Sequence, residues 1–221
     1  MTIKAVTFDI GGVLERVGDP ELALSSRWLA RLAMNEAEFA AALASVDPDD
    51  AIKTGGLSEP EYASRYAAAL GLSAIQQREF MADLWDWYCG ELDVELTAFA
   101  ASLRSSVATA ILSNSADGAR REEVARYSFD EIFDPIIYSH EVGLAKPDPA
   151  IYELTCARLG VEPREMIFVD DTPGHVEAGR RLGIHAIVHV NTPDTIAAIT
   201  SLLDGELALG VEKVGGCATH S

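Results

Sequence analysis

Short apolar runs that end abruptly in polar residues constrain the fold of this chain more than any other feature. Three of them are residues 3–8, which end in Asp9, residues 107–112, which end in Ser113, and residues 167–169, which end in Asp170. Runs of this length, bounded by glycine or polar residues, predict buried strands. Because they alternate with helical patterns, they predict a parallel sheet with helices on both faces. The polar residues are therefore expected at one edge of the sheet, where such folds bind ligands.

The part of the chain after Leu96 continues this alternation. Further strands are expected at residues 136–138 and 186–190, and helices at residues 98–104, 118–127, 149–160 and 173–183. Asp148 and Pro149 are typical of an N-cap and a first helical position. Lys146, just before them, is expected at the same sheet edge as Asp9. Residues 120–123, two arginines and two glutamates, are expected to form a solvated helix face.

Residues 19–94 differ from the rest of the chain in their composition and spacing. Alanine, leucine and glutamate dominate, and apolar residues recur at helical spacing, as in Trp28, Leu29 and Leu32. Proline and glycine residues interrupt the pattern at several points, the first of them Pro48. The segment is therefore expected to be an insert of about four helices.

The charge of the chain limits the partners that it can attract. Its formal net charge is −18, from 35 acidic and 17 basic residues. A field of this sign repels nucleic acid and anionic membrane surfaces, and neither is expected as a partner. It repels phosphate esters too, so a phosphate site would need local positive charge from a metal ion or a lysine.

The cysteines and histidines show no pattern typical of a structural metal site. The three cysteines fit neither zinc spacing nor a disulfide framework. The five histidines, His175 among them, lack metal or triad spacing and are expected to be structural or at the surface. No signal peptide and no run of ~20 apolar residues is visible, so a cytoplasmic location is expected.

Four segments resemble, in order, the four motifs of the haloacid dehalogenase superfamily. They are residues 8–14 (FDIGGVL), 112–114 (LSN), 145–148 (AKPD) and 168–171 (FVDD). The resemblance implies a Rossmann-like, doubly wound parallel α/β core at residues 1–14 and 95–204, with a helical-bundle cap domain inserted at residues 15–94. Residues 205–221 show no clear period and are expected to be a frayed C-terminal tail.

The resemblance also implies a role for the acidic motif residues. Asp9 would be the nucleophile and would form an aspartyl-phosphate. Magnesium would be held by Asp9, by the backbone carbonyl of Gly11 and by Asp171, which all supply the oxygen ligands that this cation prefers. Asp170 would lie in the outer sphere of the metal or bind it through water.

The remaining motif residues are implied to contact the phosphoryl group. Ser113 would donate a hydrogen bond to a phosphoryl oxygen. Lys146 would bring positive charge to the transferring group and would keep Asp9 ionised. Weaker candidates for phosphate contacts are Asn114 and the backbone amides of Ile10, Gly11 and Gly12.

Gly11 departs from the pattern of the family. Members usually have a second aspartate there, which protonates the leaving oxygen and later activates water. Such general acid–base help is typically worth about 10²–10⁴ in rate. The role would then fall to water, to a residue such as Glu15, or to the substrate. Leaving groups that depart readily, such as the anomeric oxygen of a sugar 1-phosphate, are therefore expected to be favoured.

Taken together, these residues favour a magnesium-dependent phosphatase that hydrolyses a small phosphorylated metabolite, a sugar phosphate being one candidate. A haloacid dehalogenase is the alternative enzyme, because those members also lack the second aspartate. A catalytically inactive HAD-like binding domain is the alternative without activity. The oligomeric state stays open between monomer and homodimer. Trp85, Trp87 and Tyr88 are expected in the core of the insert, with the alternative that one of them lines the substrate pocket.

Overall fold

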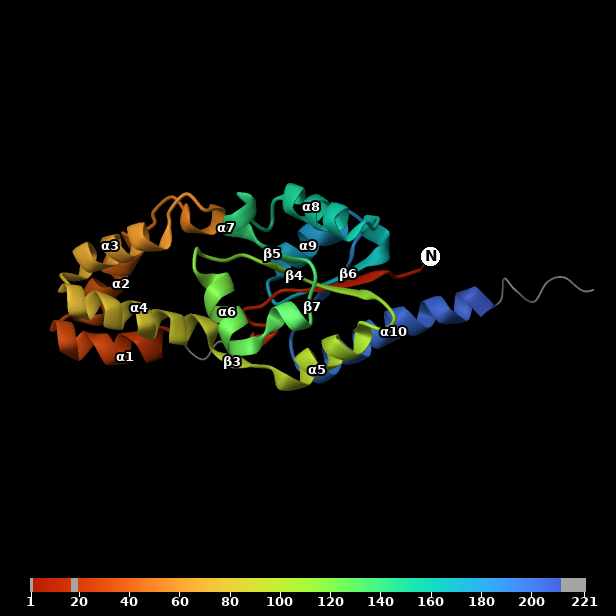
Figure 1. Ribbon diagram of the computed structural model, residues 1–221, viewed down its shortest axis with the longest axis horizontal. Coiled ribbons are helices and arrows are strands. Elements are labelled where there is room, and N and C mark those ends of the chain that lie inside the picture. Colours follow the sequence, from red (N-terminus) through yellow and green to blue (C-terminus); the bar gives the residue numbers. More distant parts are fainter. Residues whose placement is uncertain (1, 17–19, 212–221) are drawn as a thin grey trace, which may run out of the picture.

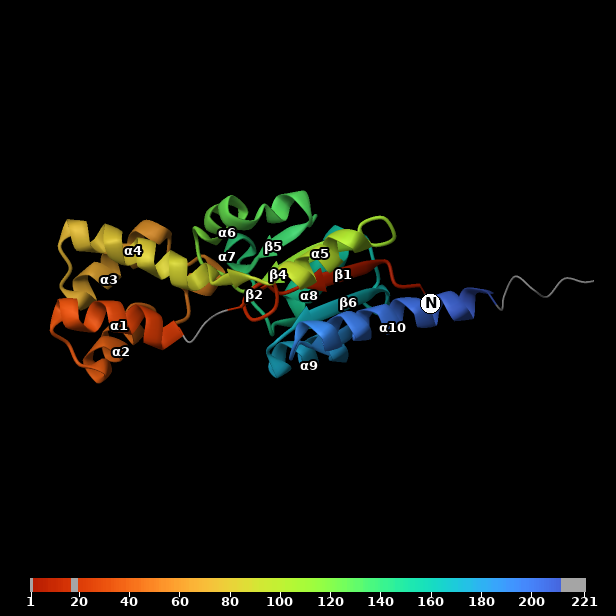
Figure 2. The ribbon, with the colours of Figure 1, turned by 90° about the horizontal axis from the view of Figure 1, so that it is seen from below.

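The computed structural model describes residues 2–16 and 20–211 of the 221-residue chain. The molecule is elongated, with a bundle of helices at one end, an α/β core in the middle and the last helix extending from the other end (Figure 1). A view turned by 90° shows the same order along the long axis (Figure 2). Of the described helices, none is both long and apolar enough to cross a membrane.

Five parallel strands form the central sheet, in the order β5-β4-β1-β6-β7. They are β1 (Ala5–Phe8), β4 (Ala108–Ser113), β5 (Ile136–Tyr138), β6 (Met166–Asp170) and β7 (His185–Val188). Phe8 pairs with Ile111 on one side and with Val169 on the other. Asp9 therefore leaves the central strand between the ends of β4 and β6. The strand order reverses at β1, and this is where open α/β sheets form a ligand-binding crevice.

Alternate strand residues build two separate apolar cores, one on each face of the sheet. Val6 and Phe8 belong to the core that includes residues of α5 (Val94–Leu103), α6 (Ala119–Tyr127) and α10 (Thr192–Val211). Ala5 belongs to the opposite core, which includes residues of α8 (Pro149–Leu159) and α9 (Pro173–Arg181). Figure 1 shows α8 and α9 above the sheet and α5 with α10 below it. This burial on both faces explains why the strands read as continuous apolar runs.

The helical insert consists of α1 (Pro20–Leu32), α2 (Glu36–Ala44), η1 (Ile52–Thr54), α3 (Glu59–Leu70) and α4 (Ala74–Cys89). It has an apolar cluster of its own, in which Trp28 packs edge-on against Phe80. Asn35, Ser58 and Ser73 form capping boxes that start α2, α3 and α4. The number of long helices agrees with the sequence-based prediction. The exact bounds of the predicted cap domain, residues 15–94, stay a prediction.

A two-stranded antiparallel sheet lies at the base of the insert. Its strands are β2 (Glu15–Arg16) and β3 (Glu91–Leu92), which pair Glu15 with Leu92. The remaining short elements are α7 (Ser139–Val142), η2 (Phe129–Glu131) and η3 (Pro163–Glu165). Because β2 and β3 have only two residues each, they are too short for any periodicity in the sequence to predict them.

The predicted strands all occur, but two helices differ from their predictions. The helix predicted at residues 98–104 begins at Val94, because the Asp93 side chain accepts a hydrogen bond from the Leu96 amide and caps it. The predicted C-terminal tail is helical at its start, since α10 continues to Val211. The rest of that tail lies outside the described residues.

Candidate active site

A cavity of about 270 Å³ opens at the carboxyl edge of the sheet, beside the end of β1. Its walls combine residues from the first, second and fourth sequence motifs with residues of the insert and of α6. The lining residues are Asp9, Gly11, Glu15, Trp87, Tyr88, Ser113, Asn114, Glu123, Asp171 and Thr172. The sequence motifs thus lie together, as expected for residues that follow parallel strands.

The Lys146 ammonium group contacts the carboxylates of both Asp9 and Asp170. Its Nζ atom lies 2.9 Å from Asp9 Oδ2 and 2.6 Å from Asp170 Oδ2, and it donates a third hydrogen bond of 3.1 Å to the Leu112 carbonyl. The side chain is completely buried. Because an ammonium group has three donors, all of them are used. The lysine therefore serves as a fixed positive charge beside Asp9.

Asn114 holds Lys146 in place through its backbone. The Asn114 side-chain amide donates to the Lys146 carbonyl at 2.9 Å, and its oxygen accepts from the Lys146 amide at 2.8 Å. Both ends of the Asn114 side chain thus bind the loop that carries the lysine. Its predicted phosphate contact stays a prediction, and the structure adds a positioning role that its spacing in the sequence did not indicate.

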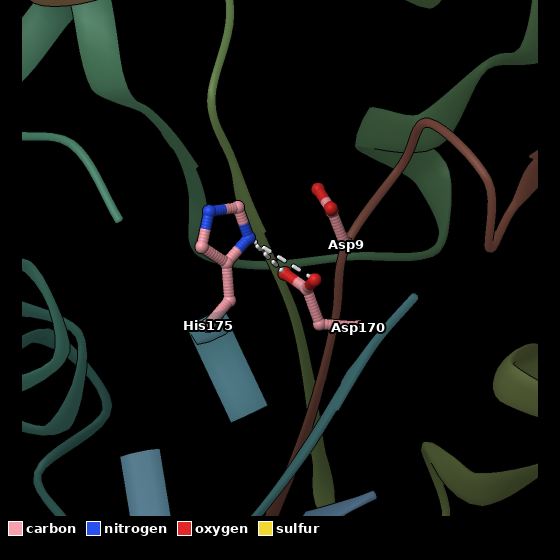
Figure 3. A group of neighbouring side chains, drawn as sticks. All are labelled: Asp9, Asp170 and His175. Atoms are coloured by element: carbon pink, nitrogen blue, oxygen red, sulfur yellow. Dashed lines mark hydrogen bonds and ion pairs between the residues drawn. The ribbon is translucent and has the colours of Figure 1, made fainter. Parts of the chain in front are cut away.

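Asp170 is the most heavily hydrogen-bonded acid of the site. Besides Lys146, it accepts from the Thr172 amide at 2.8 Å and from His175 Nδ1 at 3.1 Å. His175 extends from α9, and its ring points toward the Asp170 carboxylate, with Asp9 nearby (Figure 3). Burial alone would raise the pKa of Asp170, but the His175 hydrogen bond and the Lys146 charge outweigh it and hold that pKa well below its ordinary value.

Asp9 lies in a less favourable environment than Asp170. Burial raises the pKa of Asp9 to about 6, against the opposing charge of Lys146 and with the help of the Asp170 charge. The backbone amide of Ile10 donates to Asp9 Oδ1 at 2.8 Å. Lys146 therefore acts in the predicted direction, but burial has the larger effect. Asp9 is still mainly ionised at neutral pH.

Asp171 is exposed and lines the same cavity as Asp9. A Cβ atom at Gly12, whose φ is +75°, would meet Asp171 Oδ2 at 2.3 Å, so glycine is required there on both counts. At Gly11 a Cβ atom would meet nothing within 4 Å. The two neighbouring glycines thus differ: a side chain at Gly12 would be too close to Asp171, whereas a side chain at Gly11 has room.

The described part of the chain contains one cluster of side chains that could hold a metal ion. Asp9, Asp170 and His175 bring one ligand atom each within 4.8 Å of one another. The Lys146 ammonium already occupies this group by contacting both carboxylates, and its charge would repel a cation there. Asp9, Gly11 and Asp171 instead line the open cavity together and offer oxygen atoms only.

Glu15 and Glu123 are buried acids that line the cavity. Glu15 was named from the sequence as a residue that could take the acid role, whereas Glu123 was not. They are only 1% and 0% exposed. Burial and the nearby Glu123 and Asp9 charges raise the pKa of Glu15 to about 10. Burial also raises the pKa of Glu123 to about 8, against a hydrogen bond from the Tyr138 hydroxyl. The interpretation of residues 120–123 as a solvated face is therefore wrong for Glu123. Its position one turn after the buried Ala119 is the signal that reveals it.

The aromatic residues at the end of α4 divide between the core and the cavity. Trp85 is buried, and its indole nitrogen donates to Glu59 at 2.8 Å. Trp87 and Tyr88 line the cavity beside Asp9. Two aromatic residues of the insert thus reach the cavity beside Asp9, and the alternative that one of them lines the substrate pocket stays a prediction.

Solved structures with the same arrangement are HAD family proteins. A HAD family enzyme of Bacteroides thetaiotaomicron, in complex with magnesium and inorganic phosphate, is 19% identical, with a TM-score of 0.71 over 85% of this chain and 94% of its own. A HAD-like family hydrolase of Porphyromonas gingivalis is 26% identical, with a TM-score of 0.70 over 92% of this chain and 98% of its own. Both agree with an α/β core that carries a helical insert.

Similar sequences include phosphatases. Phosphatase MT3486 of Mycobacterium tuberculosis is 26% identical over 216 residues, which are 93% of this chain and 99% of that protein. The phosphorylated carbohydrates phosphatase of Thermotoga maritima is 33% identical over 88 residues, 40% of this chain and 37% of its own. Mouse acyl-CoA dehydrogenase family member 10 is 40% identical over 80 residues, 36% of this chain. The matched segment spans only 7% of that mouse protein.

A family profile also matches most of the chain. The profile of the family described as haloacid dehalogenase-like hydrolase matches residues 3–183. The matched stretch contains the helical insert and the strands that carry Asp9, Ser113 and Asp170. The chain therefore belongs to the haloacid dehalogenase-like hydrolases.

Proposed function

We propose that the chain is a magnesium-dependent phosphatase that hydrolyses a small phosphorylated metabolite through an aspartyl-phosphate on Asp9. The observation that carries this proposal is the position of the Asp9 carboxylate. It lines a cavity of about 270 Å³, 2.9 Å from the buried Lys146 ammonium. A nucleophile next to a fixed positive charge is what phosphoryl transfer requires, because catalysis there is mainly positioning and charge stabilisation.

The residues present fit a magnesium ion. Asp9, the carbonyl of Gly11 and Asp171 would hold it, since the three residues line the same cavity and their oxygen atoms are the ligands that magnesium prefers. The close approach of Asp171 to the Gly12 backbone, which a Cβ atom would block, supports this placement. The bound ion would supply positive charge to the phosphoryl oxygens. Asp170, which is engaged by Lys146 and His175, would support the lysine and would not contact the metal.

The residues of the chain account for both halves of the reaction. A carboxylate oxygen of Asp9 attacks phosphorus, and the bond from phosphorus to the leaving oxygen breaks, which releases the alcohol once that oxygen takes up a proton. Lys146 and Ser113 stabilise the charge on the phosphoryl oxygens. Water then attacks the same phosphorus, and the Asp9 carboxylate leaves with release of phosphate. Because Gly11 offers no acid, the preference for readily departing leaving groups stays a prediction.

Hydrolysis of para-nitrophenyl phosphate with and without magnesium tests this function. We expect activity that requires the metal and falls by at least about 10³-fold in Asp9→Asn. Asp130→Asn is the matched control, because Asp130 is exposed and does not line the cavity. It should leave the rate unchanged. Circular dichroism should show both variants folded.

Two results would contradict the proposal and would identify what replaces it. Release of halide from a 2-haloacid without metal, with no phosphatase activity, would indicate a dehalogenase. Binding of inorganic phosphate without turnover of any ester would indicate an inactive binding domain. Loss of activity in Asp130→Asn to the same degree as in Asp9→Asn would show that the effect of Asp9 is not specific.

A further inference from the structure

The loop at residues 114–118 joins the end of β4 to α6 and follows directly on Ser113. Its first residue, Asn114, binds the backbone of Lys146 with both ends of its side chain. Ser115, the next residue, is buried. The loop therefore begins at the two side chains, Ser113 and Lys146, that would contact a phosphoryl group. Its position decides where Ser113 lies.

The other end of this loop is bound by the helical insert, through Asp117. The Asp117 carboxylate accepts a hydrogen bond of 2.8 Å from the backbone amide of Glu59, the first residue of α3. Its backbone carbonyl accepts from the Tyr62 hydroxyl at 2.6 Å. The first amides of a helix have no partner inside the helix, and a negative charge next to them is favourable. Asp117 thus caps a helix of the insert from across the boundary between insert and core.

The Glu59 side chain strengthens the same contact. Its Oε1 atom accepts from Trp85 Nε1 at 2.8 Å, and the Arg121 guanidinium donates to both of its oxygens, at 2.7 and 2.9 Å. Arg121 belongs to α6, which follows the loop. A Cβ atom at Gly118 would meet Trp85 at 2.6 Å and the Glu59 carboxyl group at 3.2 Å. The loop and the insert are therefore packed too closely to admit even a methyl group between them.

A second contact of the insert reaches the loop through α7. Ser115 Oγ lies 2.8 Å from His140 Nδ1, and the Ser115 amide donates to Ser139 Oγ at 2.9 Å. A Cβ atom at Gly55 would meet the His140 carbonyl oxygen at 2.2 Å. Gly55 ends η1, and the orange segment of the insert that contains η1 lies next to α7 (Figure 1). The insert thus contacts the loop directly at Asp117 and, through His140, at Ser115.

We propose that Glu59 and Gly55 are positioning residues, through which the insert fixes the loop at residues 114–118, and with it Ser113, in the geometry that binds the phosphoryl group. The inference rests on the proposed phosphatase function and gives the insert a role at the phosphoryl end of the substrate. Neither residue lines the cavity beside Asp9, so neither acts by contact with the substrate.

A role at the phosphoryl group has a consequence that a role at the leaving group lacks. Every phosphate ester presents the same phosphoryl group to Ser113. A shift of the loop should therefore lower kcat/KM by the same factor for esters with different leaving groups. It should also weaken the binding of inorganic phosphate, which has no leaving group. Shifts of about 1 Å can cost about 10²-fold in rate, so small displacements of the loop are measurable.

Gly55→Ala and Gly71→Ala form a matched pair that tests the contact with α7. Both glycines end a helix of the insert, with φ values of +73° and +65°, so alanine strains both backbones alike. At Gly55 the new Cβ atom would meet His140, whereas at Gly71 nothing lies within 4 Å. In calorimetric titrations with magnesium present, Gly55→Ala should weaken the binding of inorganic phosphate at least about 10-fold. Gly71→Ala should change it less than about 2-fold.

Glu59→Ala tests the contact with the loop, and Glu79→Ala is its control. Glu79 pairs with Arg31 inside the insert. Glu59→Ala should lower kcat/KM about 10-fold, by the same factor for para-nitrophenyl phosphate and 4-methylumbelliferyl phosphate. Glu79→Ala should leave both values within about 2-fold.

A conservative change at Asp117 separates positioning from general destabilisation. Asp117→Asn keeps an oxygen that accepts from the Glu59 amide and should retain most of the affinity for phosphate. Asp117→Ala removes that oxygen and should weaken phosphate binding about 10-fold. Circular dichroism should show every variant folded. If Gly55→Ala does not fold, Glu59→Ala decides the matter.

Two results would overturn the positioning role and leave the phosphatase intact. One is unchanged phosphate affinity in both Gly55→Ala and Glu59→Ala. The other is a loss in Glu59→Ala that differs more than about 10-fold between the two esters, which would place its effect at the leaving group. No metal-dependent hydrolysis of either ester by the wild type would instead overturn the phosphatase, and the positioning role with it.

Discussion

The candidate site contains two groups of buried acids, and their surroundings act on them in opposite ways. Asp9 and Asp170 share the Lys146 ammonium, and Asp170 gains two further hydrogen bonds. Glu15 and Glu123 have no cation in contact, and one oxygen of each has no partner. Asp9 and Asp170 stay charged because the Lys146 ammonium contacts both of them. Glu15 and Glu123 stay protonated because burial favours the neutral form and no cation contacts them. Buried acids of the same candidate site therefore differ in charge at neutral pH.

The replacement of Lys146 should have the largest effect on stability and activity of all the changes considered. Lys146→Met leaves Asp9 and Asp170 buried without their cation, which typically costs about 3–5 kcal/mol. Activity should fall by at least about 10³-fold, since the fixed charge at the phosphoryl group is lost. Urea denaturation at pH 7 and pH 5 checks the stability. The deficit should shrink at pH 5, because the unpaired carboxylates then take up protons. A deficit independent of pH would show that packing, not charge, is responsible.

Glu123→Gln tests whether the raised pKa of Glu123 makes the stability of the protein depend on pH. The folded-state pKa of Glu123, about 8, lies above its ordinary value. Unfolded Glu123 therefore releases its proton at lower pH than the folded form, and the wild type loses stability as pH rises from about 5 to 8. The slope for one such group approaches about 1.4 kcal/mol per pH unit. Glu123→Gln should flatten this slope in denaturation measurements over that range.

Glu122→Gln provides the control for this measurement. The Arg126 and Arg121 hydrogen bonds lower the pKa of Glu122 despite partial burial. Its contribution to stability is therefore present at neutral pH and lost only as pH falls below its ordinary value. The variant should not change the slope between pH 5 and 8. If it flattened the slope as much as Glu123→Gln, the assignment of the slope to Glu123 would be wrong.

His175 should give the smallest effect of the series. His175→Ala removes one hydrogen bond to Asp170 and should lower the free energy of unfolding by about 1–2 kcal/mol near pH 7. The depressed pKa of Asp170 means that this contribution is present above its ordinary value and is lost as pH falls further. His175→Asn keeps a donor near the position of Nδ1 and should retain most of the stability. Equal losses in both variants would indicate packing of the ring as the cause.

The fold was largely predictable because its signals are local. Each sheet strand is an apolar run, and each ends at a polar residue or a glycine-rich turn, so periodicity alone locates it. Asp148 caps α8 as its sequence position indicates, through a hydrogen bond of 2.9 Å from the Ala150 amide. The two-residue strands β2 and β3 escaped prediction because their pairing joins Glu15 to Leu92, far apart in the sequence. Pairing of that kind leaves no local pattern.

Only those residues of the candidate site that belong to the four sequence motifs were fully predictable. Asp9, Ser113 and Lys146 follow recognisable patterns, and the structure brings them to one edge of the sheet. Glu123 was misjudged because its partner, Tyr138, is specified by the tertiary fold. The contact of His175 with Asp170 is specified in the same way, and the expectation of a structural or surface histidine did not name it. A glutamate between charged neighbours on a helix looks solvated until the buried face of that helix is known. Burial, and with it the raised pKa, depends on contacts that sequence spacing does not encode.

The two adjacent glycines of the first motif give the site unequal freedom to evolve. Any side chain at Gly12 would collide with Asp171, whereas a side chain at Gly11 would enter open space. A Cβ atom at Gly11 would meet no atom within 4 Å, so the acid that this chain lacks there would need no rearrangement of the backbone. Its absence is therefore not imposed by the architecture. A lineage that kept this fold could gain or lose that acid repeatedly while the neighbouring glycine stayed fixed.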